Sequence, residues 1–175
     1  MTRFLRWFVI SVDAFFGILV SGCTFSAPQF ESAIVLAQSV IASNDPKSAG
    51  ETATWFASVD GTGAVLNPYV LNDLIVFANT DGDAIAFDGW IIRSIVGFGL
   101  REPLSISGKE GVRTFTVAGQ ETQTKCDEWS RAELIWNQTC SNGPSEIVLD
   151  DEGNIQKIAM PIGDGSVIVT LRVAK

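Results

Sequence analysis

Short apolar runs alternate with turn signals along most of the chain, from about residue 52 to the end. Ten such runs span 52–59, 73–79, 84–87, 90–96, 112–117, 121–126, 132–138, 146–149, 155–161 and 166–173. Asp-Gly pairs separate several of them, and both residues tolerate the positive φ that tight hairpin turns require. The pattern predicts a mainly β fold, either an antiparallel sandwich or a barrel-like bent sheet.

One segment ahead of these runs has a helical period instead. Its apolar residues recur at the spacing of one helix face: Phe30, Ile34, Ala37, Val40 and Ile41. Pro46 and Gly50 follow, and both residue types break helices. The sequence therefore predicts one N-terminal amphipathic α-helix that ends near Ser43.

The first residues have the layout of an export signal. Arg3 and Arg6 precede a largely apolar run over 7–20, and small residues follow it. A charged start, an apolar centre and a small-residue cleavage site are typical of a secretory signal peptide. The run is too short and wrongly flanked for a membrane span. Asp13 lies inside it, where a charge is costly.

The end of this signal resembles the bacterial lipobox, in the sequence Val20-Ser21-Gly22-Cys23. In that motif the cysteine is linked to diacylglycerol, the signal is cut before it, and the new amino terminus is acylated. The resemblance implies a lipoprotein signal peptide over 1–22, lipid attachment at Cys23, a lipidated tether over 23–28 and a single β-rich domain over 29–175. A plain signal peptide, or an N-terminal membrane helix with an incidental cysteine, is the alternative.

Composition narrows the class of protein. The chain has 175 residues, of which 46% are hydrophobic, so one domain with a substantial core is expected and disorder is not. The formal net charge of −8 argues against nucleic acid as a partner and against a general attraction to anionic lipid heads.

Two of the three cysteines form a candidate pair. If Cys23 takes lipid, Cys126 and Cys140 remain, and a secreted domain folds in an oxidising compartment. A disulfide between them would close a loop of about 15 residues; two unrelated thiols are the alternative. The chain has no histidine, and two thiolates alone make a poor zinc site. No metal and no other cofactor is expected.

The absence of histidine also restricts the catalytic mechanisms open to this chain. Without histidine, Ser-His-Asp and Cys-His mechanisms are excluded in their usual form. Carboxylate pairs remain, as Asp81 with Asp83 or Asp127 with Glu128, and paired acids can hydrolyse sugars. Adjacent acids in turns are far more often solvated turn residues. We therefore assign no catalytic residue.

Four tryptophans lie beyond the signal: Trp55, Trp90, Trp129 and Trp136. Exposed tryptophans stack on sugar faces, whereas most tryptophans in strands belong to the core. Trp90 follows a turn and Trp129 lies between the two cysteines, so these two are candidate glycan contacts.

Two segments resemble the YjbF/GfcB family, lipoproteins of group 4 capsule and related exopolysaccharide systems. Residues 83–104, DAIAFDGWIIRSIVGFGLREPL, are similar to a family segment in which a basic residue and a small hydroxyl, here Arg93 and Ser94, follow a hydrophobic pair. Residues 145–175 are similar to the family's C-terminal hairpin of strand, acidic-Gly turn and strands. Arg93 joins the candidate glycan contacts.

The resemblance implies an envelope lipoprotein, mostly antiparallel β, without established catalytic residues. Thr24 follows Cys23 where inner-membrane retention would use an aspartate, so the outer membrane is the expected location. The expected function is to assist exopolysaccharide or capsule assembly or export from the periplasmic face, by binding and not by catalysis. The expected partners are the membrane, through the lipid anchor, and the export machinery or the polysaccharide. A carboxylate-dependent glycan hydrolase or lyase, and a structural envelope lipoprotein that binds only protein, are the alternatives.

Overall fold

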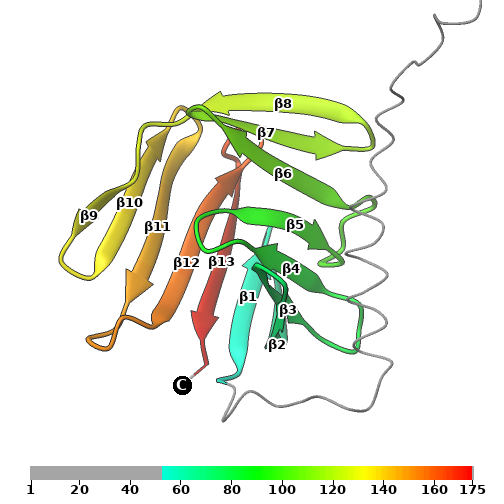
Figure 1. Cartoon of the computed structure of the whole chain (residues 1–175). Helices are drawn as coiled ribbons and strands as arrows, with labels where there is room; N and C mark the ends of the chain where they lie inside the picture. Colours follow the sequence, from blue (N-terminus) through cyan, green and yellow to red (C-terminus); the bar gives the residue numbers. More distant parts are fainter. Residues whose placement is uncertain (1–52, 175) are drawn as a thin grey trace, which may run out of the picture.

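The computed structural model describes residues 53–174, which form one antiparallel sheet of 13 strands (Figure 1). The strands are β1 (Trp55–Val59), β2 (Thr62–Leu71), β3 (Leu74–Ala78), β4 (Ala84–Phe87), β5 (Ile92–Val96), β6 (Leu104–Lys109), β7 (Val112–Val117), β8 (Gln120–Lys125), β9 (Ser130–Ala132), β10 (Ile135–Cys140), β11 (Gly143–Leu149), β12 (Ile155–Ile162) and β13 (Val167–Val173).

The sheet consists of two meanders that meet at its centre. Strands β1 to β8 run outward in chain order to one edge, and β9 to β13 return from the other edge to pair with β1. The β1–β13 pairing sets Trp55 opposite Val173, so the start and the end of the described chain lie side by side. All other ladder neighbours are consecutive in the chain. Every pairing in the sheet except β1–β13 is therefore local.

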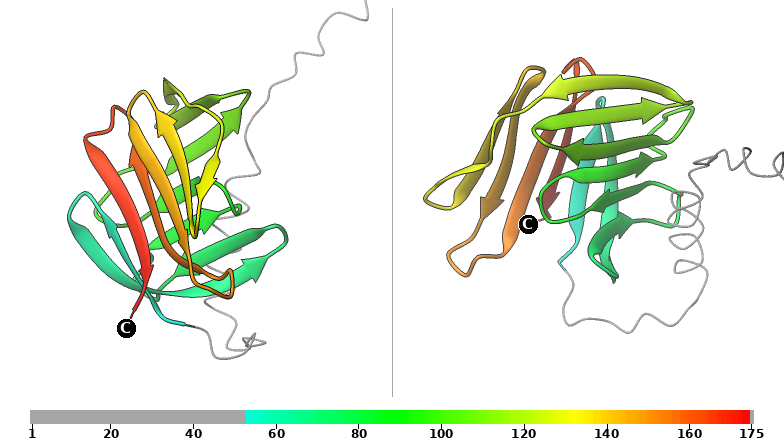
Figure 2. Two further views of the ribbon diagram at one scale, coloured as in Figure 1. Left: turned by 90° about the vertical axis from the view of Figure 1, so that its left-hand side faces the viewer. Right: turned by 45° about the horizontal axis from the view of Figure 1, so that its top comes forward.

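The sheet curls until its two outer parts approach each other, as the views in Figure 2 show. The chain that leaves β8 crosses to β10, where Asp127 N donates to Thr139 O at 2.8 Å and Ser141 N donates to Lys125 O at 2.8 Å. A disulfide joins Cys126 to Cys140 at this crossing. We call residues 126–129, between β8 and β9, the crossing segment. It ties the first meander to the second.

The main core fills the inner face of the curl. On β1, Trp55, Ala57 and Val59 are buried at alternate positions, the period of a strand with one face inward. The largest fully buried side chains come from both meanders: Phe77, Phe87, Leu66, Ile85, Ile92, Ile95, Ile106, Ile158, Met160, Leu171, Val59 and Val169. Burial of these side chains on one face is what drives the sheet to bend.

A smaller apolar cluster lies on the outer face. It contains Val76, Ala78 and Ala86, whereas Phe77, which lies between the first two on β3, belongs to the main core. Neighbouring residues of a strand point to opposite faces, so the two clusters are separated by the sheet. Strands β3 and β4 are therefore apolar on both faces.

The hairpin turns explain several strand boundaries. Asp60-Gly61, Glu110-Gly111 and Ala118-Gly119 each place two successive residues at positive φ. This is the geometry of the two-residue hairpin turn whose twist matches that of the strands. Only the first of these turns has the Asp-Gly sequence that signals it most strongly.

The prediction of a mainly β, antiparallel fold is confirmed, and of its two forms the structure has the bent sheet. The predicted run over 84–87 matches β4, and the run over 112–117 matches β7. The sequence pattern missed β6 and β9 and did not define β2.

The predicted N-terminal helix, the signal peptide over 1–22, the tether over 23–28 and Cys23 lie outside the described residues. Within residues 53–174 no helix has the length and apolarity to cross a membrane.

Candidate functional site

The turn between β4 and β5 is built around Asp88. Its Oδ1 accepts hydrogen bonds from the backbone N–H of Trp90 at 2.9 Å and of Ile91 at 2.8 Å. Asp88 N donates to Ile91 O at 3.2 Å, which closes the turn. A side-chain oxygen that accepts from the residue two positions on defines an Asx turn. Asp88 thereby fixes the backbone of the turn that carries Trp90.

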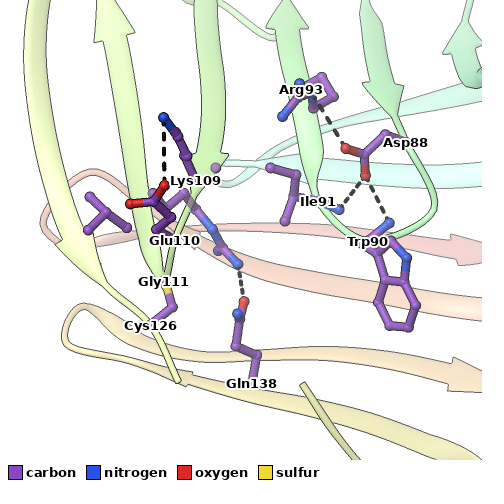
Figure 3. Close-up of a pocket in the computed structure, with 12 residues that line it drawn as sticks. Asp88, Trp90, Ile91, Arg93, Lys109, Glu110, Gly111, Cys126 and Gln138 are labelled. Atoms are coloured by element: carbon purple, nitrogen blue, oxygen red, sulfur yellow. Dashed lines mark hydrogen bonds and ion pairs between the residues drawn. The ribbon is translucent and has the colours of Figure 1, made fainter. Parts of the chain in front are cut away.

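The second oxygen of Asp88 serves a different partner. Its Oδ2 lies 3.5 Å from Nε of Arg93, and both side chains are partly exposed. Figure 3 shows Trp90 and Arg93 on either side of Asp88. Both carboxylate oxygens are therefore engaged, one with the backbone at Trp90 and the other with the guanidinium of Arg93.

Trp90 is the centre of a cluster of three tryptophans. Its ring centroid lies 5.8 Å from that of Trp129 and 5.1 Å from that of Trp136, the second pair being edge-to-face. Trp129 and Trp136 are partly buried against the main core, whereas Trp90 is 46% exposed. Arg131 lies over the Trp136 ring, 5.7 Å from its centroid. Two partly buried rings thus contact one exposed ring, whose face is open to a ligand.

A pocket of about 250 Å³ lies beside this cluster, between the β4–β5 turn, the β6–β7 hairpin and β10. Its polar and aromatic lining includes Asp88, Trp90, Arg93, Lys109, Arg113 and Gln138 (Figure 3). Three of the chain's 12 basic residues are among them. The pocket thus gathers cations in a protein whose net charge is −8.

Arg113 is the buried cation of this pocket. Its side chain extends from β7 across the curl, where Nη1 donates to Ser145 Oγ at 3.1 Å and Nη2 donates to Gln138 Oε1. Only 2% of the residue is exposed. Burial lowers the pKa of Arg113 to about 10, and the negative charge of Asp88 opposes that shift. Its charge is therefore only partly compensated.

Arg113 belongs to a set of polar side chains that joins the two outer parts of the sheet. Gln138 Nε2 donates to the carbonyl oxygen of Asp127 in the crossing segment, at 2.7 Å. Thr124 and Ser141 are hydrogen-bonded through their hydroxyls at 2.8 Å. We call Arg113, Thr124, Gln138, Ser141 and Ser145 the polar end of the curl. The Cys126–Cys140 disulfide lies beside it.

The first acid pair named from the sequence, Asp81 with Asp83, lies in a hydrogen-bonded turn before β4. Asn79 Oδ1 accepts from the backbone N–H of Asp81 and of Asp83, at 3.0 Å each. Asp83 Oδ1 in turn accepts from Phe98 N at 2.6 Å, and a side chain at Gly97 would collide with that carboxylate. The side chains of Asn79 and Asp83 therefore shape the turns around β4, and Asp81 takes part through its backbone N–H.

The other pair, Asp127 and Glu128, is exposed in the crossing segment. Among residues 53–174, no three side chains of the histidine, cysteine or acidic types are grouped to hold a metal ion.

The candidate glycan contacts named from the sequence come together. Trp90 and Arg93 line the same pocket, and Trp129 packs on Trp90. Trp136 and Arg113 were missed. The sequence does contain a signal for Arg113. In VRTFTV it precedes Phe115 by two positions, so both side chains point to the same, inward face of the strand.

Comparison with known proteins gives one informative likeness. No protein-family model matches the chain, and no curated protein matches it. The crystal structure of the hypothetical lipoprotein YmcC from Escherichia coli (K12) is similar, with a TM-score of 0.52 and 10% sequence identity. The match covers 81% of this chain and 95% of that one. At this identity the likeness shows a shared fold.

Proposed function

We propose that the protein is a lipid-anchored envelope protein that binds a glycan and assists the assembly or export of a surface polysaccharide. Its anchor is Cys23, and its location is the periplasmic face of the outer membrane. It acts by binding and carries out no catalysis.

The anchor half of this proposal rests on the sequence and on the fold. Val20-Ser21-Gly22-Cys23 has the lipobox pattern after a charged and apolar leader. The protein with the similar fold is itself a hypothetical lipoprotein. A diacylglycerol group together with an acylated amino terminus exceeds what stable membrane attachment requires.

The binding half rests on one observation, the tryptophan cluster beside the pocket. Trp90 is 46% exposed although it contacts two other tryptophans, and Asp88 fixes its backbone. Leaving a large aromatic ring exposed forgoes the stabilisation that its burial would give. A ring that is held in place is suited to stacking on the apolar face of a sugar. Asp88 uses both oxygens to hold this arrangement, which suits orientation of a ligand better than proton transfer.

The test measures surface polysaccharide in a strain from which the coding sequence is deleted. The strain is complemented with the wild type, Cys23→Ala, Trp90→Ala, or Ile168→Ala as a matched control. Ile168 is another exposed hydrophobic side chain, on β13 away from the pocket. We expect the deletion to reduce the polymer, and only the wild type and Ile168→Ala to restore it.

Each contrary outcome contradicts a stated part. Unchanged polymer in the deletion strain would contradict the role in assembly or export. Full rescue by Cys23→Ala would contradict the anchor. Full rescue by Trp90→Ala would contradict glycan binding at this cluster and leave a protein that binds only other proteins.

A further inference from the structure

We infer that the pocket between the β4–β5 turn and the β6–β7 hairpin recognises a carboxylated sugar unit, such as a uronic acid, whose carboxylate binds Arg113 and Arg93 while its ring lies on Trp90. This inference rests on the proposed glycan binding and names the chemical class of the glycan.

The charge of Arg113 is only partly compensated. The residue is 2% exposed, and its hydrogen bonds go to the neutral side chains of Ser145 and Gln138. No carboxylate oxygen in residues 53–174 lies within ion-pairing distance of its guanidinium. Burying a charge without a counter-ion is costly, and a guanidinium has further N–H donors in a planar fork. A ligand carboxylate in the pocket would supply the missing anion.

The carboxylate that could have neutralised Arg113 is committed elsewhere. Asp88 lines the same pocket, but its oxygens hold the turn at Trp90 and pair with Arg93 at 3.5 Å. The Arg93 side chain remains 34% exposed in that pair. Arg93 is therefore the more exposed of the two arginines that line the pocket, and Arg113 is the buried one.

The charge balance of the pocket indicates the kind of anion. Arg93, Lys109 and Arg113 oppose only Asp88 and Glu110, which leaves an excess of one positive charge. A carboxylate carries a single negative charge, whereas a phosphate monoester carries about −1.5 to −2 at neutral pH. Lys109 and Glu110 are largely exposed and 3.7 Å apart, so solvent screens their contribution. The pocket thus matches a carboxylate better than a phosphate monoester.

The volume of the pocket and the Trp90 ring in its lining indicate the kind of molecule that carries the carboxylate. The volume of about 250 Å³ lies just below the range of roughly 300–1,000 Å³ that drug-sized ligands occupy. One sugar residue of a longer chain fits this size, with its neighbours outside. Trp90 lines the pocket and offers its face to the apolar side of such a ring.

The test measures the affinity of detergent-solubilised full-length protein for an oligosaccharide of glucuronic acid, a glucose oligosaccharide of equal length, and the methyl ester of the acidic one. Calorimetry gives the affinity, and tryptophan fluorescence reports on the Trp90 cluster. We expect the acidic oligosaccharide to bind at least about tenfold more tightly than both neutral ones, the effect of one charge-assisted contact. Glucose 1-phosphate should not compete with it.

Variants connect this preference to the pocket. Arg113→Met and Arg93→Gln should each remove the preference for the acidic oligosaccharide. Arg172→Gln removes the same charge from β13, beside Phe56, and should leave the preference intact. Circular dichroism confirms that each variant is folded, and Arg93→Gln, at a partly exposed side chain, gives a result even if Arg113→Met does not fold.

The outcomes separate this inference from the proposed function. Equal binding of acidic and neutral oligosaccharides would overturn the carboxylate assignment and leave glycan binding standing. Binding of none of them would contradict both. A preference that survives in Arg93→Gln and in folded Arg113→Met would overturn the assignment to this pocket. Competition by glucose 1-phosphate would overturn the choice of carboxylate over phosphate.

Discussion

The inner face of the curled sheet has two regions of opposite character. Across most of the face, the buried side chains are apolar, such as those of Phe77, Phe87 and Ile158. Where β7 and β8 approach β10 and β11, three buried polar residues occur instead: Arg113, Thr124 and Ser145. Thr124 lies opposite Arg113 in the β7–β8 ladder.

The difference between these regions shows what each one contributes. Apolar burial stabilises the fold in proportion to the area removed from water. A buried cation with neutral partners does not stabilise the fold in this way, because its desolvation cost offsets its hydrogen bonds. A covalent bond, Cys126–Cys140, holds this same region together. The apolar core therefore maintains the fold, and the disulfide maintains the shape of the polar end.

The largest effect is expected in the apolar core. Phe87 is fully buried on β4, so Phe87→Ala removes its contacts and leaves a cavity. Such substitutions cost roughly 3–5 kcal/mol of the free energy of unfolding. Urea denaturation followed by circular dichroism measures this loss. Val65→Ala, at a residue 56% exposed on β2, is the control and should stay within about 0.5 kcal/mol of wild type. A small loss at Phe87 would remove the distinction between the two regions.

Removal of the disulfide should cause the second largest loss of stability. The double variant Cys126→Ala/Cys140→Ala frees a loop of sequence separation 14, which costs roughly 3 kcal/mol in the chain-entropy model. Hydrogen exchange should increase first at the two crossing hydrogen bonds, Asp127 N to Thr139 O and Ser141 N to Lys125 O. The amides of β1 and β13 should stay protected. Uniform loss of protection would show that the polar end is part of the core's cooperative unit.

Arg113→Met should have a smaller effect on stability. It removes the hydrogen bonds to Ser145 and Gln138 but also removes the cost of burying a charge, so we expect a loss of about 1 kcal/mol. The same urea denaturation measures it. A loss as large as that of Phe87→Ala would make Arg113 a structural member of the core and would end the contrast between the two regions.

The same contrast explains how far the sequence could predict the molecule. Strands of the apolar core were readable because their own residues carry the pattern, as in WFASV of β1 and AIAF of β4. Strand β6, LSISGK, carries the alternation only in Leu104 and Ile106, and the exposed β9, SRA, has no apolar pattern. Pairing with neighbouring strands completes them.

The site shows a similar division. Trp90 and Arg93 lie three positions apart in the chain, so their proximity follows from one turn. Arg113 meets Gln138 at a separation of 25 residues and Ser145 at 32, and these contacts exist because the sheet curls. The curl depends on packing across the whole inner face, which no local pattern contains. The contacts of Arg113 and Trp136 could not be predicted for this reason, although the position of Arg113 on the inward face of VRTFTV is a local signal.

The smallest effect is expected at the β11–β12 turn, which belongs to neither region. Asp150 Oδ1 accepts from Asn154 N at 2.8 Å and from Glu152 N at 3.0 Å. The hydrogen bond from the Asn154 backbone is the main cause that holds the pKa of Asp150 below its ordinary value of 3.8. A lowered pKa stabilises the fold above the unfolded value and loses that contribution as pH falls through the folded value.

Asp150→Ala should therefore melt below wild type at neutral pH. The gap should begin to narrow as the pH falls below about 3.8 and should close once the pH is below the lowered pKa of Asp150. Thermal unfolding followed by circular dichroism over this pH range measures the gap. Asp151→Ala removes the same charge from the next exposed position and controls for net charge. A gap that persists in acid would mean that the carboxylate's charge is not what stabilises this turn. The gap at neutral pH should stay below that of Arg113→Met, because the turn is exposed to solvent and buries no charge.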